Sequence, residues 1–301
     1  MCIRDRIDDG RYRYIERVKS SFPNQMRLDG LKVVIDCANG AGYRAAPEVL
    51  WELGAEVVPI GVSPDGRNIN LECGSTSPRI AAETVVAHGA DVAICLDGDA
   101  DRVLVIDEQG CPIDGDHFLG MIGSRWQKED ILVEKTLVAT VMSNMHLETF
   151  LNREGIKLVR TAVGDRYVVE QMRLNGFNLG GEKSGHVVMT DYSTTGDGLM
   201  AGLQFLAEMV RRGEPASAVG RPFDLAPQKT ENIIYASEKN PLDNTSVKKI
   251  ISESEKKISG LGRLIVRKSG TERLIRIMVE AEDISMIDAT ISSIRNAIKE
   301  L

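Results

Sequence analysis

Residues 91–106, DVAICL-DGDADR-VLVI, place three aspartates between two apolar runs. Apolar runs of this length are typical of buried strands, so the acidic segment is expected to be a tight loop at a strand's end. The carboxylates of Asp97, Asp99 and Asp101 repel one another at this spacing. A hard divalent cation such as Mg²⁺, which prefers carboxylate and phosphate oxygens, relieves that repulsion. Arg102, the next residue, can face the same phosphate. The alternative interpretation is an acidic surface turn.

The composition is that of an ordinary globular protein of two or three domains, with 301 residues, 43% hydrophobic and 27% charged. A net charge of −7 and a pI of about 5.3 argue against nucleic acid or an anionic membrane as partner. No apolar run approaches the ~20 residues of a membrane helix, and no signal peptide opens the chain. Five scattered cysteines without a Cys-x-x-Cys pair favour reduced thiols in a cytoplasm over disulfides or zinc.

Strands and helices alternate from residue 31 to about residue 212, with many helices ending at glycine, and a hairpin is expected at 103–113. The pattern changes near 220–227, where two prolines bracket a loop, to a strand, a helix, two adjacent strands and a final helix. Isoleucines three and four residues apart predict one buried face on that helix: Ile284, Ile287, Ile291, Ile294 and Ile298. The expected fold is α/β, with two successive three-layer αβα mixed-sheet domains followed by a small C-terminal α+β domain.

A second polar segment, GGEKSGH at 180–186, leads into an apolar run. Alternate side chains of an extended stretch share one face, so Glu182, Ser184 and His186 are expected to point together. A carboxylate, a hydroxyl and an imidazole on one face suit the hydroxyl groups of a sugar, and the flanking glycines let a ligand approach closely. The alternative interpretation is a strand with a polar, solvent-facing side.

A third segment, VRKSGTERLIR at 266–276, sets cations and hydroxyls between two expected strands. Arginine, hydroxyls and a glycine N–H are what a phosphate monoester binds. The alternative interpretation is a basic hairpin loop. Gly164-Asp165-Arg166 adds a capped helix start with one cation beside it. The binding candidates from these segments are Arg166, Arg267, Ser269, Gly270, Thr271 and Arg276.

No nucleophile can be identified from the sequence: there is no Gly-x-Ser-x-Gly elbow, no Walker loop and no dinucleotide fingerprint after a strand. The residues alone therefore predict an Mg²⁺-dependent protein that handles a phosphorylated polyol.

The three segments together resemble the motifs of the α-D-phosphohexomutases. The metal loop Asp-Gly-Asp-(Gly/Ala)-Asp-Arg matches 97–102, the sugar loop Gly-Glu-x-Ser-Gly-His matches 181–186, and the phosphate loop Arg-x-Ser-Gly-Thr-Glu matches 267–272. The resemblance runs from about residue 7 to the C-terminus. Three further segments resemble the bacterial glucosamine branch of the family: 73–76, 163–168 and 194–198. Lys183 and Arg273 depart from residues common at these positions.

This resemblance implies a double phosphoryl transfer between glucosamine 6-phosphate and glucosamine 1-phosphate. A phosphoserine gives its phosphoryl group to one sugar hydroxyl, and the resulting sugar bisphosphate reorients and returns its other phosphate. One Mg²⁺ per chain would lie on Asp97, Asp99 and Asp101, with Arg102 beside it. Glu182 and Ser184 would hold sugar hydroxyls, and His186 would orient substrate or assist proton movement. The implied partner is a phosphosugar, the implied location is cytoplasmic, and a homodimer is allowed.

The family's phosphoserine lies in a Ser-His-Asn-Pro-like loop of its first domain, and no such loop occurs in the 301 residues. The chain is therefore expected to correspond to domains two to four of a truncated record and to be inactive alone. The expected divisions are 1–28 for the tail of a first domain or linker, 29–127 for metal binding, 128–224 for sugar binding and 225–301 for phosphate binding. Alternatives are phosphomannomutase/phosphoglucomutase activity, a non-catalytic sugar-phosphate-binding module, and a phosphatase with Asp97 as nucleophile.

Overall fold

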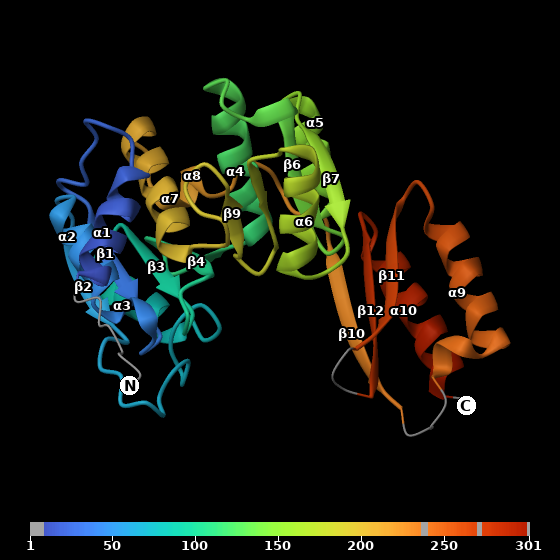
Figure 1. Ribbon diagram of the computed structural model, residues 1–301. Helices are drawn as coiled ribbons and strands as arrows, with labels where there is room; N and C mark the ends of the chain where they lie inside the picture. The colour runs from blue at the N-terminus through green and yellow to red at the C-terminus, as the bar shows by residue number, and fades with distance from the viewer. Residues whose placement is uncertain (1–8, 236–239, 270–272, 300–301) are drawn as a thin grey trace, which may run out of the picture. The chain divides into compact units, whose positions relative to one another are not determined.

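The protein is described by a computed structural model that covers residues 9–235, 240–269 and 273–299 (Figure 1). The chain divides into two compact units, residues 1–143 with 150–223 and residues 144–149 with 224–301. Among the described helices, none has the length and apolar character needed to cross a membrane.

The first sheet has the strand order β2-β1-β3-β4-β5, with β1 parallel to β2 and β3 and with β4 antiparallel to β3 and β5. Its strands are β1 (Lys32–Asp36), β2 (Glu56–Ile60), β3 (Val92–Leu96), β4 (Val103–Asp107) and β5 (Pro112–Ile113). The helices along this part of the chain are α1 (Gly10–Ser20), α2 (Ala45–Glu52), α3 (Arg79–His88) and α4 (Gly115–Lys128). The expected hairpin is confirmed, because β4 and β5 pair across residues 108–111.

The second sheet repeats the topology of the first four strands of the first sheet, with order β7-β6-β8-β9 and an antiparallel last pair. Its strands are β6 (Thr136–Thr140), β7 (Lys157–Thr161), β8 (Leu179–Gly181) and β9 (Val187–Met189). The helices are α5 (Met145–Arg153), α6 (Asp165–Asn175), α7 (Gly198–Arg212) and α8 (Ala216–Val219). In each sheet, therefore, the third and fourth strands in chain order are joined by a short loop at the carboxyl end of the third.

Helices cover both faces of each sheet, as the sequence predicts for a three-layer fold. On one face of the first sheet, Val34 and Cys95 belong to a buried cluster with Val85 of α3. On the other face α7 lies so close that a methyl group at Gly202 would be 2.9 Å from Ile94 Cγ2. Alternate residues of buried strands thus face different helices, which explains their continuous apolar character.

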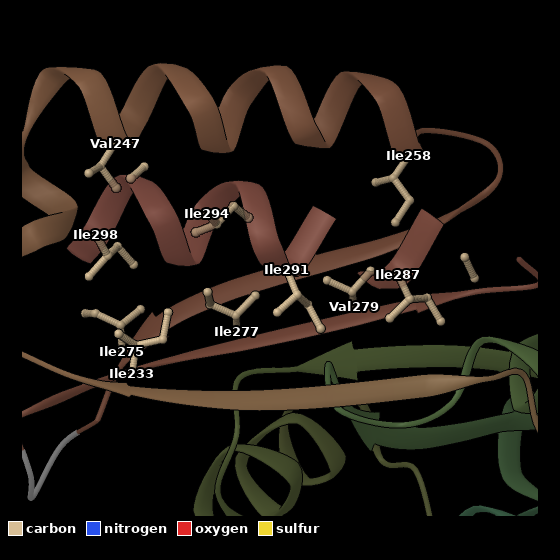
Figure 2. Packing of buried hydrophobic residues seen from close by; sticks show 12 residues of the cluster. Ile233, Val247, Ile258, Ile275, Ile277, Val279, Ile287, Ile291, Ile294 and Ile298 are labelled. Carbon is tan, nitrogen blue, oxygen red and sulfur yellow. The ribbon is translucent and has the colours of Figure 1, made fainter. Parts of the chain in front are cut away.

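The second unit contains an antiparallel sheet of order β10-β12-β11, covered on one face by two helices. Its elements are β10 (Gln228–Ile234), α9 (Thr245–Ile258), β11 (Gly262–Lys268), β12 (Leu274–Ala281) and α10 (Ile284–Lys299). Figure 2 shows isoleucines of α10 packed onto Ile275 and Ile277 of β12. Four of the five isoleucines predicted to face this core are buried, whereas Ile284 is 63% exposed because it is the first residue of the helix.

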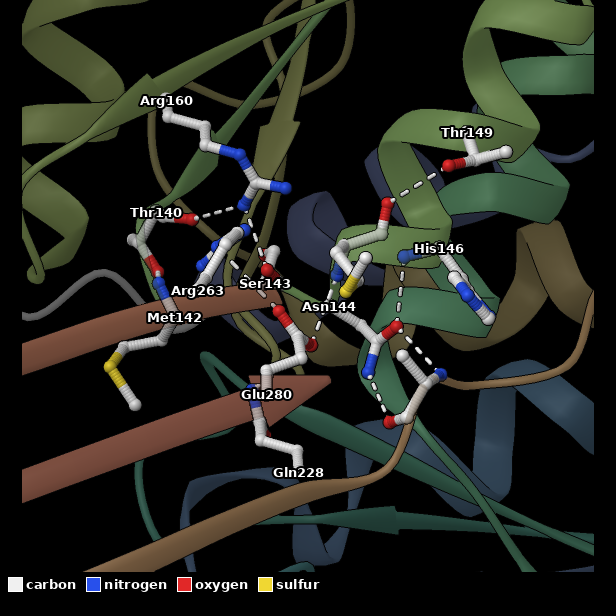
Figure 3. A network of polar contacts seen from close by, with 12 residues as sticks. Thr140, Met142, Ser143, Asn144, His146, Thr149, Arg160, Gln228, Arg263 and Glu280 are labelled. Atoms are coloured by element: carbon white, nitrogen blue, oxygen red, sulfur yellow. Dashed lines mark hydrogen bonds and ion pairs between the residues drawn. The ribbon is translucent and has the colours of Figure 1, made fainter. Parts of the chain in front are cut away.

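Two buried polar residues anchor the start of α5 to this second unit (Figure 3). The side chain of Asn144 donates to the carbonyl of Ala226 (3.0 Å) and accepts from the N–H of Ala226 (3.1 Å). The Glu280 carboxylate accepts from the N–H of Met145 (3.0 Å) and lies 3.6 Å from the Arg263 guanidinium. Residues 144–149 are therefore tied to the C-terminal sheet although they precede it by some eighty residues.

Candidate active site

The acidic loop lies where the sequence predicts, at the carboxyl end of β3 and before β4. Asp97, Asp99 and Asp101 each offer one carboxylate oxygen, and these oxygens lie within 4.8 Å of one another. Asp97 is buried, Asp101 is half-buried and Asp99 is exposed. The three carboxylates thus converge at one end of the sheet, where ligands of such sheets gather.

Backbone hydrogen bonds from two distant segments hold the residues between these ligands. The N–H of Ala41 donates to the carbonyl of Gly98 (2.8 Å), and the N–H of Gly198 donates to the carbonyl of Ala100 (2.9 Å). A methyl group at Gly40 would lie 2.2 Å from the Gly98 oxygen, so glycine is required at Gly40 for this approach. The loop therefore has one defined shape.

The electrostatics of the loop fit a divalent cation. Burial, together with the charges of Asp101 and Asp99, raises the pKa of Asp97 to about 6, although a hydrogen bond from the Arg102 N–H opposes the rise. The Arg102 guanidinium Nε lies 3.9 Å from Asp97 Oδ2 and 3.8 Å from Asp101 Oδ1, too far for a hydrogen bond. Three crowded oxygen donors with incompletely compensated charge are the ligand set that Mg²⁺ prefers.

Segment 180–186, which the sequence predicts to bind sugar, differs from the extended stretch that its alternating pattern predicts. Glu182 to Gly185 form a turn between β8 and β9, closed by a hydrogen bond from the Gly185 N–H to the Glu182 carbonyl (3.0 Å). The three polar side chains consequently point to different places. Glu182 accepts from the N–H of Gly164 (3.1 Å), Ser184 is exposed, and His186 is buried.

This turn and the acidic loop are directly joined. The N–H of Val103 donates to the carbonyl of Gly185 (3.0 Å), and Arg102 forms a β-bridge with His186. Nδ1 of His186 lies 3.1 Å from Oδ2 of Asp101. The motifs at 97–102 and 181–186 therefore form one site, although more than 75 residues separate them.

The phosphate-binding segment lies in the second unit and is described in part. Arg267 on β11 and Arg276 on β12 are register partners, and Arg276 Nε donates to Asn232 Oδ1 (3.0 Å). Burial and the charge of Arg276 lower the pKa of Arg267. Two neighbouring guanidiniums suit a dianionic phosphate. Gly270 and Thr271 lie outside the described residues, and the N–H of Ser269 donates to the carbonyl of Leu274 (2.9 Å).

Arg166 lies in the first turn of α6, as expected, where its guanidinium lies over the Tyr167 ring at 4.5 Å from the centroid. The side chain is exposed and can turn toward a ligand.

The sequence analysis did not predict that Tyr14 contacts the segment 194–198. Tyr14 on α1 donates to the Asp197 carboxylate (3.1 Å), and Asp197 caps α7 by accepting from the Met200 N–H (2.9 Å). Burial and the Asp197 charge raise the pKa of Tyr14. The only sequence signal was an Asp-Gly pair before an apolar helix, which predicts a cap and not a contact with α1.

A cavity of about 380 Å³ between α4 and α7 lies away from all of these motifs. Several of its lining charges are paired, with Lys128 Nζ 3.4 Å from Glu154 and with Arg211 beside Glu129 and Glu208.

Comparison with protein families gives three matches along the chain, all described as phosphoglucomutase/phosphomannomutase. Alpha/beta/alpha domain II matches residues 12–110, alpha/beta/alpha domain III matches residues 114–222, and the C-terminal domain matches residues 231–297.

Curated relatives include the phosphoglucosamine mutases of Ruegeria sp., 62% identical over 294 residues, and of Roseobacter denitrificans, 61% identical over 295 residues. These alignments cover 98% of this chain, and the chain spans 66% of the length of each relative.

Two solved structures share the fold. A phosphoglucomutase/phosphomannomutase family protein from Burkholderia thailandensis matches with a TM-score of 0.78 at 21% identity, covering 96% of this chain and 64% of that one. The Aspergillus fumigatus N-acetylphosphoglucosamine mutase, solved with GlcNAc-6P and magnesium, matches with a TM-score of 0.75 at 18% identity, covering 95% and 69%. At these identities the likeness concerns the fold.

Proposed function

The chain belongs to the phosphoglucomutase/phosphomannomutase family, and from this premise we propose that it acts as a phosphoglucosamine mutase, interconverting glucosamine 6-phosphate and glucosamine 1-phosphate. The observation that carries the proposal is the Val103–Gly185 hydrogen bond, which joins the acidic loop to the turn at 182–185. The choice of glucosamine is supported by the relatives, which are named phosphoglucosamine mutases at 58–62% identity.

The acidic loop is proposed to hold one Mg²⁺ through Asp97, Asp99 and Asp101. When bound, the ion would offset negative charge on the phosphoryl group in transfer. Arg102 is proposed to contact the same phosphoryl group, which is supported by its part-exposed guanidinium lying near two of these carboxylates.

Glu182 and Ser184 are proposed to bind sugar hydroxyls from the turn between β8 and β9. The phosphate that does not react is assigned to the second unit, to Arg267, Ser269, Gly270, Thr271 and Arg276. Arg166 of the first unit is proposed as a separate substrate-binding residue. Glucosamine 6-phosphate and glucosamine 1-phosphate carry their phosphate at opposite ends of the sugar. One fixed binding position for the phosphate that does not react therefore lets the same site serve both half-reactions. The sugar bisphosphate is then the intermediate that turns between them.

The donor in this reaction is a phosphoserine, and the 301 residues contain no Ser-His-Asn-Pro-like loop to supply it. The homodimer and the cytoplasmic location stay predictions. So do the domain divisions at 29–127, 128–224 and 225–301.

The test is to express the protein from its natural gene and to compare turnover of glucosamine, mannose and glucose phosphates with Mg²⁺ and the matching bisphosphate primer. We expect the highest kcat/KM for glucosamine 6-phosphate. Faster turnover of mannose or glucose phosphates would assign the chain to the phosphomannomutase/phosphoglucomutase branch instead. A protein that binds these sugars without turnover would be a binding module.

A further inference from the structure

The guanidinium of Arg125 is buried in the first unit without an ion-pair partner among the described residues. Arg125 lies on α4 and is 6% exposed. Its Nη1 donates to the carbonyl of Gln204 on α7 (3.0 Å), and its Nη2 donates to the side-chain oxygen of the same residue. Its Nε is buried and has no hydrogen-bond partner in the part of the chain that the structure describes. A guanidinium has five N–H donors, so these two hydrogen bonds leave three donors for another acceptor.

The acidic side chains whose charges act on Arg125 are engaged by another cation. Glu129 pairs with Arg211, and Glu208 lies 3.4 Å from the same guanidinium. Burial lowers the pKa of Arg125, and the charge of Glu129 only opposes that shift. Taking a guanidinium out of water is costly when no anion pairs with it. Burial that the protein does not compensate is expected at functional sites.

Arg125 lines the cavity of about 380 Å³ between α4 and α7, and also a second cavity of about 250 Å³. The residues that line the larger cavity belong to none of the three motifs at 97–102, 181–186 and 267–272. Its remaining cations are paired in the described part of the chain, Lys128 with Glu154 and Arg212 with Glu214. The positive charge that this cavity offers to a ligand is therefore that of Arg125.

The larger cavity also has an apolar wall, formed by Met121, Phe150 and Pro222. We propose that it binds a small organic anion, with one carboxylate or phosphate group on Arg125 and an apolar body against Met121 and Phe150. A planar guanidinium donates in parallel pairs to either oxyanion, and a cavity of this size admits a metabolite. The proposal does not depend on the proposed function, because it uses no residue of the candidate active site.

The test has to report on the cavity itself, because an oxyanion can also bind the proposed phosphate segment of the second unit. Residues 1–301 are labelled with [¹³C-methyl]methionine, and NMR follows the methyl group of Met121, which lines the cavity. The methyl group of Met172, in a buried cluster of the second sheet, is the internal control. The probes are benzoate and phenyl phosphate, with neutral benzamide as the isostere of benzoate.

We expect at least one oxyanion to shift the Met121 resonance with a Kd of ~1 mM or tighter, while the Met172 resonance stays in place. Benzamide should bind ~10-fold more weakly or not at all, because it lacks the charge that pairs with Arg125. The oxyanion that binds more tightly identifies the class of ligand as a carboxylate or a phosphate.

Arg125→Met removes the charge and the donors but keeps a long side chain, so it should weaken binding ~10-fold or more. Arg173→Met removes an exposed arginine of α6 and is the matched control, with the affinity of wild type. Circular dichroism establishes that both variants are folded. The proposal is overturned by no shift of Met121 at ~10 mM of either oxyanion, by equal affinity for benzamide, or by unchanged affinity in Arg125→Met. The first two outcomes are measured on the wild-type chain and decide the question if Arg125→Met does not fold.

Discussion

At the scale of single residues, the three aspartates of the acidic loop are not equivalent. Asp97 is buried at the end of β3 and accepts from the Arg102 N–H (3.1 Å), so its orientation is set by the fold. Asp101 is held by His186. Asp99 is exposed, and no hydrogen bond from the described residues holds its carboxylate, so its orientation is the least fixed of the three.

Asp99→Asn is therefore expected to weaken metal binding with little effect on stability. The substitution keeps the size of the side chain but removes one of three anionic ligands, and we expect Mn²⁺ affinity to fall ~10-fold or more, at least as much as on loss of an outer partner. The measurement is Mn²⁺ titration together with the thermal midpoint. Asp130→Asn, which removes an equally exposed carboxylate on a turn elsewhere, serves as control. Wild-type affinity in Asp99→Asn would identify the residue as part of an acidic surface turn.

A pH-dependent contribution to stability is predicted for His146 in the second unit. Burial lowers the pKa of this imidazole, but the Asp224 carbonyl at 2.8 Å and the Glu282 carboxylate at 2.6 Å outweigh burial and raise the pKa above 6.5. A folded-state pKa above the unfolded one stabilises the fold below the unfolded value, and this stability is lost as pH rises through the folded value.

Glu282→Gln should accordingly lower the His146 pKa, as followed by NMR titration of the imidazole protons. Because Glu282 is 69% exposed, solvent screens the pair, and the variant should lose only about 0.2–1 kcal/mol at pH 6 and almost nothing at pH 9. An equal loss at both pH values would mean that the contact stabilises as a neutral hydrogen bond.

At the scale of elements, α10 illustrates that the contribution of an isoleucine to the free energy of unfolding depends on its burial and not on its hydrophobicity alone. Ile291, which faces the C-terminal sheet in Figure 2, is 1% exposed. Ile284 in the same helix is 63% exposed. Ile291→Ala is expected to cost about 2–5 kcal/mol in the free energy of unfolding of the second unit, from lost transfer energy and a residual cavity. Ile284→Ala should cost less than about 0.5 kcal/mol. Urea unfolding monitored by circular dichroism checks the pair, and equal losses would contradict the packing.

The elements themselves could be predicted closely because their ends carry local signals. Gly89, Gly176 and Gly213 take left-handed conformations that end α3, α6 and α7, as glycines after amphipathic runs predict. The same local reasoning failed for 182–186. Alternating polar residues predict an extended strand there, but the left-handed φ of +87° at Gly185 turns the chain. The antiparallel pairing of β8 with β9, a contact between two segments, requires the chain to turn here.

The site could be predicted only as a set of residue types. The acidic triplet shows itself by its spacing, and its three carboxylate oxygens do converge within 4.8 Å. The contact of Asp101 with His186 joins residues 85 positions apart, and no periodicity within either segment reveals it. The hydrogen bond from the Gly198 N–H to the Ala100 carbonyl could not be predicted either, because a backbone donor does not depend on the side-chain pattern.

At the scale of the whole molecule, the first unit presents two loops at equivalent positions of two sheets with the same topology. The acidic loop follows the third strand of one sheet and the sugar-binding turn follows the third strand of the other. The cation and the polyol are thus proposed to bind at the same architectural position of the two sheets.

The 301 residues alone are expected to show no mutase turnover. Phosphoryl transfer depends on a donor aligned with the acceptor hydroxyl, and none of the motifs described here is a phosphate carrier. The test incubates residues 1–301 with Mg²⁺, glucosamine 6-phosphate and a bisphosphate primer, and follows glucosamine 1-phosphate. Mn²⁺ binding by the same preparation controls for folding. Sustained turnover of ~1 s⁻¹ or more would place a nucleophile within this chain.

The hydrogen bond from Val103 to Gly185 joins the loop proposed to bind the cation to the turn proposed to bind the sugar. We expect each ligand to favour the other's binding through this shared backbone, and thermodynamic linkage then requires the same factor in both directions. We expect saturating glucosamine 6-phosphate to tighten Mn²⁺ ~5-fold or more, and Mn²⁺ to tighten the sugar phosphate by that same factor, in paired calorimetric titrations. A factor of one in both titrations would show the two loops to be independent. With such coupling, the proposed site would take up its cation and its sugar phosphate cooperatively, so that at a given overall occupancy the singly loaded states are less populated than they would be for independent loops.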